Sequence, residues 1–318
     1  VWGVQDVPIS LNEFKWFRMS ADLEESIKDP IAISDSPFTA TFEDYDNRLK
    51  HPALPKYLFG LVRIAFGYSA EEIQSHPAGT PEAKQLIFFG RIINAILLSS
   101  SVLLIYFVTR KMAGNLAGLI SMIFLGTNAI LLVYLRQVSG DALLIFLLTL
   151  YLYALVDGER ESIAHGIVLG LIASAQITWI FLFPLSIIVL IWPRKDEARN
   201  IPAALLRVFS FFVSLIFTFL LLNPLYWQHP ALVIPAVFEA AIPALEAETS
   251  SFLLKIGNFV QEIFMAEPDL SFSNFSSELS SAGQIYLSNP ANLLFRGILG
   301  GSVIFLLSLL GFGVILVR

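Results

Sequence analysis

Uncharged stretches divide the chain more clearly than any other feature. Five of them approach or reach the roughly 20 residues that cross a bilayer as a helix, namely residues 92–109, 116–135, 142–156, 208–222 and 297–317. A longer stretch, residues 164–192, contains a polar interruption at 175–178 and a proline at 184, which predict two short helices that meet at a turn. The pattern predicts an all-α polytopic membrane protein, a helix bundle with about seven spans.

The charged residues gather in blocks between these stretches. Residues 1–85 hold 13 acidic and 8 basic side chains, and residues 223–292 hold seven acidic side chains and one lysine. Short connections are basic instead, at Arg110 and Lys111 and again within residues 193–207. The positive-inside rule places these basic turns in the cytoplasm, and alternating spans then put both acidic blocks outside. A single span over residues 164–192 would break this alternation, which favours two helices there.

Composition excludes several classes of protein. The chain of 318 residues is 56% hydrophobic and only 14% charged, with a mean hydropathy of +0.70 and no cysteine. Soluble domains carry about 25% charged residues, so an ordinary soluble enzyme and a disulfide-built secreted module are both excluded. The net charge of −6 argues against nucleic acid as a partner, because phosphate binding needs a basic surface.

These features predict an organisation in four parts. A first extracytoplasmic loop with interfacial helices covers residues 1–85, and a bundle of about six spans covers residues 86–222. A second extracytoplasmic loop covers residues 223–292 and a further span covers residues 293–318. Within the second loop, residues 252–266 repeat apolar side chains three or four apart, as an interfacial helix does. The first residue is not methionine and the chain ends directly after an apolar run, so we expect a fragment of a larger protein.

Motifs of soluble enzymes are missing from the sequence. There is no glycine-rich nucleotide loop, no zinc-protease helix and no serine-hydrolase elbow. The four histidines are too scattered to predict a metal site. No cofactor is predicted, and a divalent metal near the acidic residues stays open, although no ligand spacing supports one.

Polar residues of the first block follow an order that carries the functional argument. Residues 12–20 read Asn-Glu-Phe-Lys-Trp-Phe-Arg-Met-Ser, the acids Glu43, Asp44 and Asp46 come next, and residues 51–57 read His-Pro-Ala-Leu-Pro-Lys-Tyr. Further along, residues 136–141 read Arg-Gln-Val-Ser-Gly-Asp and residues 223–227 read Asn-Pro-Leu-Tyr-Trp. In this order the chain resembles the GT-C fold glycosyltransferases that use lipid-linked sugars, in the branch of the protein O-mannosyltransferases and aminoarabinose transferases.

That resemblance implies an Asp-Glu pair in the first outer loop, followed by a His-Pro-Pro-Leu-like element before the next helix. One position departs from the pattern, because the family's catalytic Asp aligns with Asn12, which cannot ionise. Either the neighbouring Glu13 carries the chemistry, or one of Glu43, Asp44 and Asp46 does, or this copy is inactive. His-Pro-Ala-Leu in place of His-Pro-Pro-Leu is a smaller change.

Sugar transfer from a polyprenyl phosphate explains why such residues belong together. A carboxylate takes the proton of the acceptor's hydroxyl or amine, and cations hold the departing phosphate, where negative charge develops. Arginine suits the second role because its planar fork pairs with two phosphate oxygens. The catalytic candidates are Asn12, Glu13, Glu43 and Asp44, and the substrate-binding candidates are His51, Lys56, Arg91, Arg136 and Asp141.

Each candidate has a structural alternative. Glu13 would be a solvated loop acid, and Lys56 would extend from its helix toward lipid head groups. Arg136 would anchor its helix at the interface, and Asp141 would cap the helix that it begins. Trp16, Trp227 and Tyr226 would be aromatic residues of the interface belt rather than platforms for a sugar.

Two other functions compete with the enzyme. A transporter would place its ionisable residues at mid-membrane, often on broken helices. A catalytically inactive lipid-binding or assembly subunit would keep the fold without turnover. The enzyme interpretation implies a polyprenyl-phosphate sugar as donor, a lipid, glycan or protein as acceptor, and a multi-pass protein of a bacterial or archaeal plasma membrane or of the endoplasmic reticulum.

Overall fold

The computed structural model describes residues 11–28, 51, 53–75, 80–127, 137–157, 162–176, 182–191, 201–224 and 226. Regular structure within these residues is entirely α-helical, which confirms the all-α prediction. The helices are α1 (Leu11–Met19), α2 (Ala21–Lys28), α4 (Ala53–Ala65), α5 (Ala70–Ser75), α6 (Pro81–Ala113), α7 (Asn115–Thr127), α9 (Asp141–Asp157), α10 (Ser162–Ala175), α11 (Leu182–Ile191) and α12 (Ile201–Leu222).

Helices occur at the predicted apolar stretches that the structure describes. Residues 92–109 lie within α6, residues 142–156 within α9, and residues 208–222 within α12. The stretch 164–192 contains α10 and α11, and α10 ends at Ala175, where the sequence predicts the break. Helix α7 covers the first part of the stretch 116–135. The predicted last span at residues 297–317 and the interfacial pattern at residues 252–266 lie outside the described residues.

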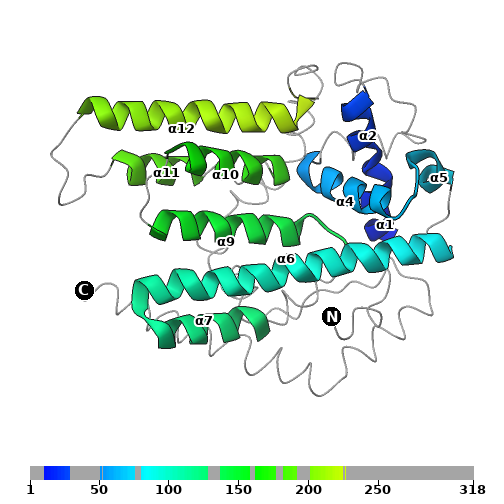
Figure 1. Cartoon of the computed structure of the whole chain (residues 1–318), viewed down its shortest axis with the longest axis horizontal. Coiled ribbons are helices and arrows are strands. Elements are labelled where there is room, and N and C mark those ends of the chain that lie inside the picture. The colour runs from blue at the N-terminus through cyan, green and yellow to red at the C-terminus, as the bar shows by residue number, and fades with distance from the viewer. Residues whose placement is uncertain are drawn as a thin grey trace, which may run out of the picture.

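The longer helices form one bundle, with the short helices gathered at one end of it. Figure 1 shows α12, α10, α9 and α6 side by side with roughly parallel axes, while α7 folds back along α6. A shared apolar core joins α9, α10, α11 and α12, and it includes Leu147, Tyr151, Ile172 and Phe211. Helices α1, α2, α4 and α5 form what we call the short-helix assembly, in which α1 and α4 lie against the first turns of α6 and α2 packs on α4.

Helix α6 is the longest element and links the bundle to the short-helix assembly. Its 33 residues span about 50 Å at 1.5 Å per residue, whereas the hydrocarbon core of a bilayer is about 30 Å thick. The helix starts where Thr80 accepts a hydrogen bond from the Ala83 N–H, with Pro81 in the first turn. It ends at Gly114, which has a φ of 92° that glycine adopts readily.

The short-helix assembly has its own apolar core. Phe14 and Phe17, three positions apart on α1, pack with Phe59 of α4 and with Leu86 and Ile87 of α6. Helix α5 begins with a capping box, in which the Ser69 N–H donates to Glu72 and the Glu72 N–H donates to the Ser69 hydroxyl. The start of α6 therefore serves as the surface on which the short-helix assembly packs.

Two of the described helices are long and apolar enough to cross a membrane, which indicates a membrane association. They are α6 and the part of α12 from Pro202 to Leu222. Only 22% and 17% of their most apolar windows are buried inside the molecule, whereas the core helix of a soluble protein is mostly buried. Helices α7, α9 and α10 are shorter apolar helices.

Candidate functional site

A buried ion pair joins the first polar block to α6. Arg91 donates from Nε to Glu13 Oε1 at 2.8 Å and from Nη2 to Glu13 Oε2 at 2.7 Å. This is the planar, two-bond geometry that arginine makes with a carboxylate. The two side chains are only 3% and 2% exposed, so solvent does little to screen their attraction. The pair fixes α1 on α6.

Glu13 also holds the segment that precedes α9. The Val138 N–H donates to Glu13 Oε1 at 2.8 Å. Asn94, about one turn further along α6, donates from Nδ2 to the carbonyl oxygens of Gln137 and Ser139 at 2.6 and 3.2 Å. Two side chains from different parts of the chain therefore clasp the backbone of residues 137–139.

Two side chains pack closely on the backbone of α6 beside these hydrogen bonds. A Cβ atom at Gly90 would lie 2.8 Å from Val138 Cγ2 and 2.9 Å from Phe17 Cζ, closer than van der Waals contact permits. Glycine at this position of α6 therefore lets α1 and residues 137–139 both reach the helix surface.

The first turn of α4 brings together several of the motifs that the sequence separates. The ring of His51, just before α4, lies 5.1 Å from the ring of Trp16 between centroids. A Cβ atom at Gly140 would lie 3.1 Å from Pro55 Cγ, so the segment before α9 also touches this turn. Residues 12–20, 51–57 and 137–141 thus meet at one end of the bundle.

The motif after α12 reaches the same turn. Asn223 Oδ1 accepts a hydrogen bond from the Ala53 N–H at 3.2 Å, which caps the start of α4. Its Nδ2 donates to Ser174 Oγ and to the carbonyl oxygen of Phe219, both at 2.8 Å. The Asn223 side chain therefore ties α4 to both α10 and α12.

A second buried ion pair lies on this turn. Lys56 Nζ and Asp22 Oδ2 are 2.9 Å apart, with side chains that are 3% and 10% exposed. Next to it, the hydroxyls of Tyr57 and Ser26 are 2.8 Å apart. Both contacts join α2 to α4.

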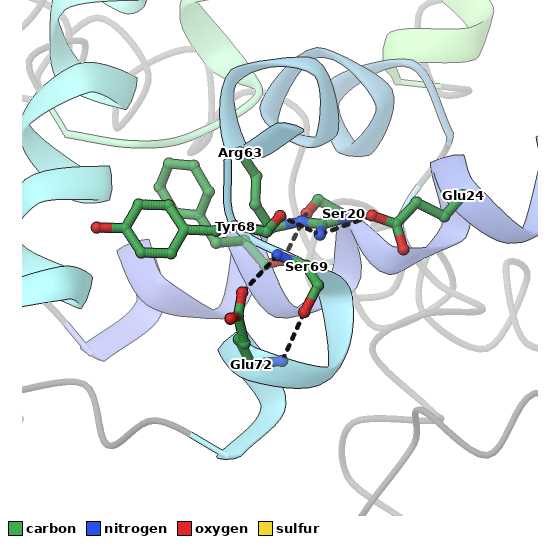
Figure 2. Close-up of polar contacts among 7 residues, drawn as sticks. Ser20, Glu24, Arg63, Tyr68, Ser69 and Glu72 are labelled. Carbon is green, nitrogen blue, oxygen red and sulfur yellow. Dashed lines mark hydrogen bonds and ion pairs between the residues drawn. The ribbon is translucent and has the colours of Figure 1, made fainter. Parts of the chain in front are cut away.

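A third ion pair joins the same two helices further along α4 (Figure 2). Arg63 donates from Nη1 to Glu24 Oε1 and to the Tyr68 carbonyl oxygen, each at 2.9 Å, and from Nε to Ser20 Oγ at 3.0 Å. Arg63 is fully buried, while the Glu24 side chain is 22% exposed. Figure 2 also shows the Ser69–Glu72 capping box beside it.

The predicted site residues fall into two groups. The structure brings Glu13, Arg91, His51 and Lys56 into the region where the short-helix assembly meets α6 and α12. Asp141 begins α9 a few residues beyond the clasped segment, and its carboxylate is exposed, with no hydrogen-bond partner in the structure's described part. Asn12 lies in the first turn of α1. Glu43, Asp44 and Arg136 lie outside the described residues, as does Asp46.

Burial decides between some of the alternatives. Glu13 is 1% exposed, so its interpretation as a solvated loop acid is wrong. Lys56 is 2% exposed and paired with Asp22, so it does not extend toward lipid head groups. The assignment of catalysis to Glu13 stays a prediction, and its engagement with three N–H donors favours a positioning role.

Sequence reasoning missed Asp22 and Asn94, because neither belongs to a recognisable motif. A weak signal existed for Asp22. Lys56 and Arg63 are seven positions apart, and that spacing places two cations on one face of a helix, where an acidic partner helix is expected. Helix α2, which carries Asp22 and Glu24, is that partner.

Tyr226, four residues beyond the end of α12, packs its ring edge-on against Phe219 with 5.2 Å between centroids. Its hydroxyl is enclosed and has no hydrogen-bond partner among the residues that the structure describes. Burial raises the pKa of Tyr226 to about 12, so the hydroxyl stays protonated at neutral pH.

Among the described residues, no group of three histidine, cysteine, aspartate or glutamate side chains lies close enough together to hold a metal ion. Comparison of the chain with protein-family models, with curated proteins and with solved structures gives no match. The functional argument therefore rests on the residues themselves and on the contacts that bring them together.

Proposed function

We propose that this chain is a multi-pass membrane glycosyltransferase. It transfers a sugar from a polyprenyl-phosphate-linked donor to a lipid, glycan or protein acceptor on the extracytoplasmic face. The observation that carries the proposal is that described residues of four separated motifs, namely Trp16, Pro55, Gly140 and Asn223, meet around the first turn of α4.

The outer surface of the bundle supports a membrane environment. Large apolar side chains cover the solvent-facing side of α12, and soluble proteins rarely expose contiguous apolar patches of this kind. The exposed residues on α12 are Leu205, Leu206, Phe209, Val213, Ile216, Phe217, Leu220 and Leu221. Hydrocarbon chains of lipids are suitable neighbours for such a surface.

The contact between α10 and α12 also has the character of a membrane-helix pair. Gly166 and Gly170, four positions apart on α10, face Ser214 and Thr218 on α12. A Cβ atom at Gly170 would lie 2.8 Å from Thr218 Cβ, so the two backbones are in close approach. Membrane helices commonly associate through small residues four apart, because lipid offers no hydrophobic driving force between them.

Convergence of the motifs supports the functional part of the proposal. Four segments that are far apart in the sequence share one end of the bundle. A transferase needs that arrangement, because a proton acceptor and phosphate-binding cations must both reach the same sugar. Lys56 lies on the shared turn, while Arg91 holds Glu13, and Glu13 in turn accepts a hydrogen bond from Val138 in the segment that leads to Asp141.

The hydrogen bonds that each side chain already makes suggest its role in the proposed reaction. Arg91 gives two hydrogen bonds to Glu13, so this pair serves to organise the site. Lys56, on a flexible stem, and Arg136, outside the described residues, are the proposed contacts of the donor phosphate. The proton acceptor is Glu13 or another acid of the same polar block.

The full chain in lipid nanodiscs provides the test. Purified protein is incubated with polyprenyl-phosphate mannose or polyprenyl-phosphate aminopentose, and transfer to added acceptors or to water is measured. Glu13→Gln and Asp44→Asn are compared with Glu71→Gln, which changes an exposed acid on α5. We expect transfer by the native chain and by Glu71→Gln, with a loss in at least one of the other two variants. Unchanged transfer in both would refute the site assignment, and solute flux without a covalent product would favour a transporter.

Asn12 supports a second candidate, an inactive subunit that binds the lipid donor. An amide cannot take up a proton as a base, and Glu13 beside it is held by Arg91 and Val138. This candidate predicts saturable binding of polyprenyl phosphate to the purified chain, with no release of sugar in the same preparation.

A further inference from the structure

We propose that Asp22 is the carboxylate that takes the acceptor's proton, and that its ion pair with Lys56 is the resting form of the reactive pair. This inference rests on the proposed glycosyltransferase function. It assigns a role to a residue that belongs to none of the motifs, on the basis of where the fold places it.

The acids of the short-helix assembly differ in burial and in their place relative to the turn where the motifs meet. Glu13 accepts three N–H donors at 2.7–2.8 Å and its side chain is 2% exposed, which makes it a poor proton acceptor for a substrate. Glu24 pairs with Arg63 further along α4, and Glu71 is exposed on α5. Asp22, with a side chain that is 10% exposed, lies in the first turn of α2 and pairs with Lys56 on the turn of α4 where the motifs meet.

Lys56 occupies an unusual place for a cation. It lies in the first turn of α4, where the helix dipole presents positive partial charge and disfavours a second positive group. A helix N-terminus with a lysine on its first turn is an arrangement suited to an anion. In the structure, Lys56 Nζ lies 2.9 Å from the Asp22 carboxylate, while the Ala53 N–H of the same turn donates to Asn223.

A donor phosphate would compete with Asp22 for this cation. When the phosphate binds Lys56, whose four-carbon stem is flexible, the Asp22 carboxylate is released beside the bound sugar. Asp22 then takes the proton from the acceptor O–H or N–H while the acceptor atom bonds to C1 of the sugar. The bond between C1 and the phosphate oxygen breaks, and its electron pair leaves with the polyprenyl phosphate. The products are the glycosylated acceptor, polyprenyl phosphate and a protonated Asp22.

Asp22→Asn is the first test, in the full chain in nanodiscs with the two polyprenyl-phosphate sugars named above. General base catalysis contributes roughly 10²–10⁴-fold, so we expect kcat to fall by about that factor. The affinity of the variant for polyprenyl phosphate is expected to stay within about threefold of the native affinity, because Lys56 remains. Asp22→Glu keeps a carboxylate and is expected to retain at least about a tenth of kcat.

A matched control separates the loss of a catalytic carboxylate from the loss of packing between α2 and α4. Glu24→Gln breaks the other ion pair between α2 and α4, which has the same 2.9 Å separation, and it is expected to leave kcat within about twofold. The reversed pair, Asp22→Lys with Lys56→Asp, keeps an ion pair but moves the carboxylate. A merely structural role predicts that this reversal restores transfer, whereas a base at position 22 predicts that it does not.

The outcomes distinguish this proposal from the one on which it rests. Transfer by the native chain that survives Asp22→Asn, or that returns in the reversed pair, overturns the role of Asp22 alone. An equal loss in Asp22→Asn and Glu24→Gln also overturns it, because the common effect is then the loss of packing between α2 and α4. No transfer by the native chain overturns the proposed function and the role of Asp22 together.

Discussion

Breaking the Glu13–Arg91 pair is expected to destabilise the protein strongly. The substitution Glu13→Gln keeps the size of the side chain and removes its charge, so the buried Arg91 loses the carboxylate to which it gives two hydrogen bonds. Removing one partner of a buried ion pair costs about 3–5 kcal/mol, because the other charge remains desolvated. The side chains here are 3% and 2% exposed, and the two bonds between them measure 2.8 and 2.7 Å, so the full range applies.

A double-mutant cycle separates the interaction from the packing. The variants are Glu13→Gln, Arg91→Met and the two together, and the free energy of unfolding is measured in detergent micelles. We expect each single change to cost about 3–5 kcal/mol and the double change to cost clearly less than the sum, because it leaves no buried charge uncompensated. Glu24→Gln is the control, with a smaller expected cost because its side chain is 22% exposed and water can reach it.

Two results would refute this reasoning. Additive losses in the cycle would show that the two side chains do not interact energetically, despite their geometry. A loss below about 1 kcal/mol for Glu13→Gln would show that Arg91 finds water or another acceptor, as an exposed pair does.

Other substitutions test the packing, the start of α6 and the end of α12. Gly166→Ala places a Cβ atom against the backbone oxygen of Phe211, so we expect a loss of about 1–3 kcal/mol in unfolding experiments, whereas Gly126→Ala, with only ordinary contacts, is expected to be nearly neutral. Thr80→Ala removes the N-cap of α6 and is expected to cost about 1 kcal/mol, with Thr80→Ser retaining most of the stability. Tyr226→Phe removes an enclosed hydroxyl without a partner in the described structure and is expected to be neutral or stabilising at pH 7. Because the pKa of Tyr226 is raised from 10.0 to about 12, the native chain is expected to lose stability as pH rises through this range, and melting curves of the phenylalanine variant are expected not to show that loss.

Many of the helix positions could be predicted from the sequence. Helix α9 (Asp141–Asp157) differs by one residue at each end from the uncharged stretch 142–156, because a charge at either end of an apolar run marks where the helix leaves its apolar surroundings. The outer part of α6 could not be predicted in this way. Glu82, Lys84 and Arg91 interrupt its apolar pattern, yet the helix continues because its first turns pack on the short-helix assembly rather than on lipid.

The site could be predicted only in part, because its contacts are non-local. Glu13 and Arg91 are 78 positions apart, and Glu13 and Val138 are 125 apart. Motif order indicates that such residues belong to one site, but it does not indicate which acid faces which cation. Pairing of Glu13 with Arg91, and of Lys56 with Asp22, depends on how α1 and α2 lie on α6 and α4, which local patterns of polar and apolar residues do not specify.

The short-helix assembly contains buried ion pairs although it also has an apolar core, and this combination needs an explanation. Well-packed hydrophobic residues often stabilise a fold as much as a buried ion pair does, since desolvation offsets most of the attraction. Phe14, Phe17 and Phe59 already supply an apolar core within the short-helix assembly, so the fold has an apolar means of cohesion. Placing Glu13, Asp22 and their partners beside that core lowers the stability that apolar packing would give. Charge at this end of the bundle is therefore better explained by a need for charge in the chemistry or in the orientation of the site. The reversed pair distinguishes these two needs, because it keeps the ion pair but moves the carboxylate.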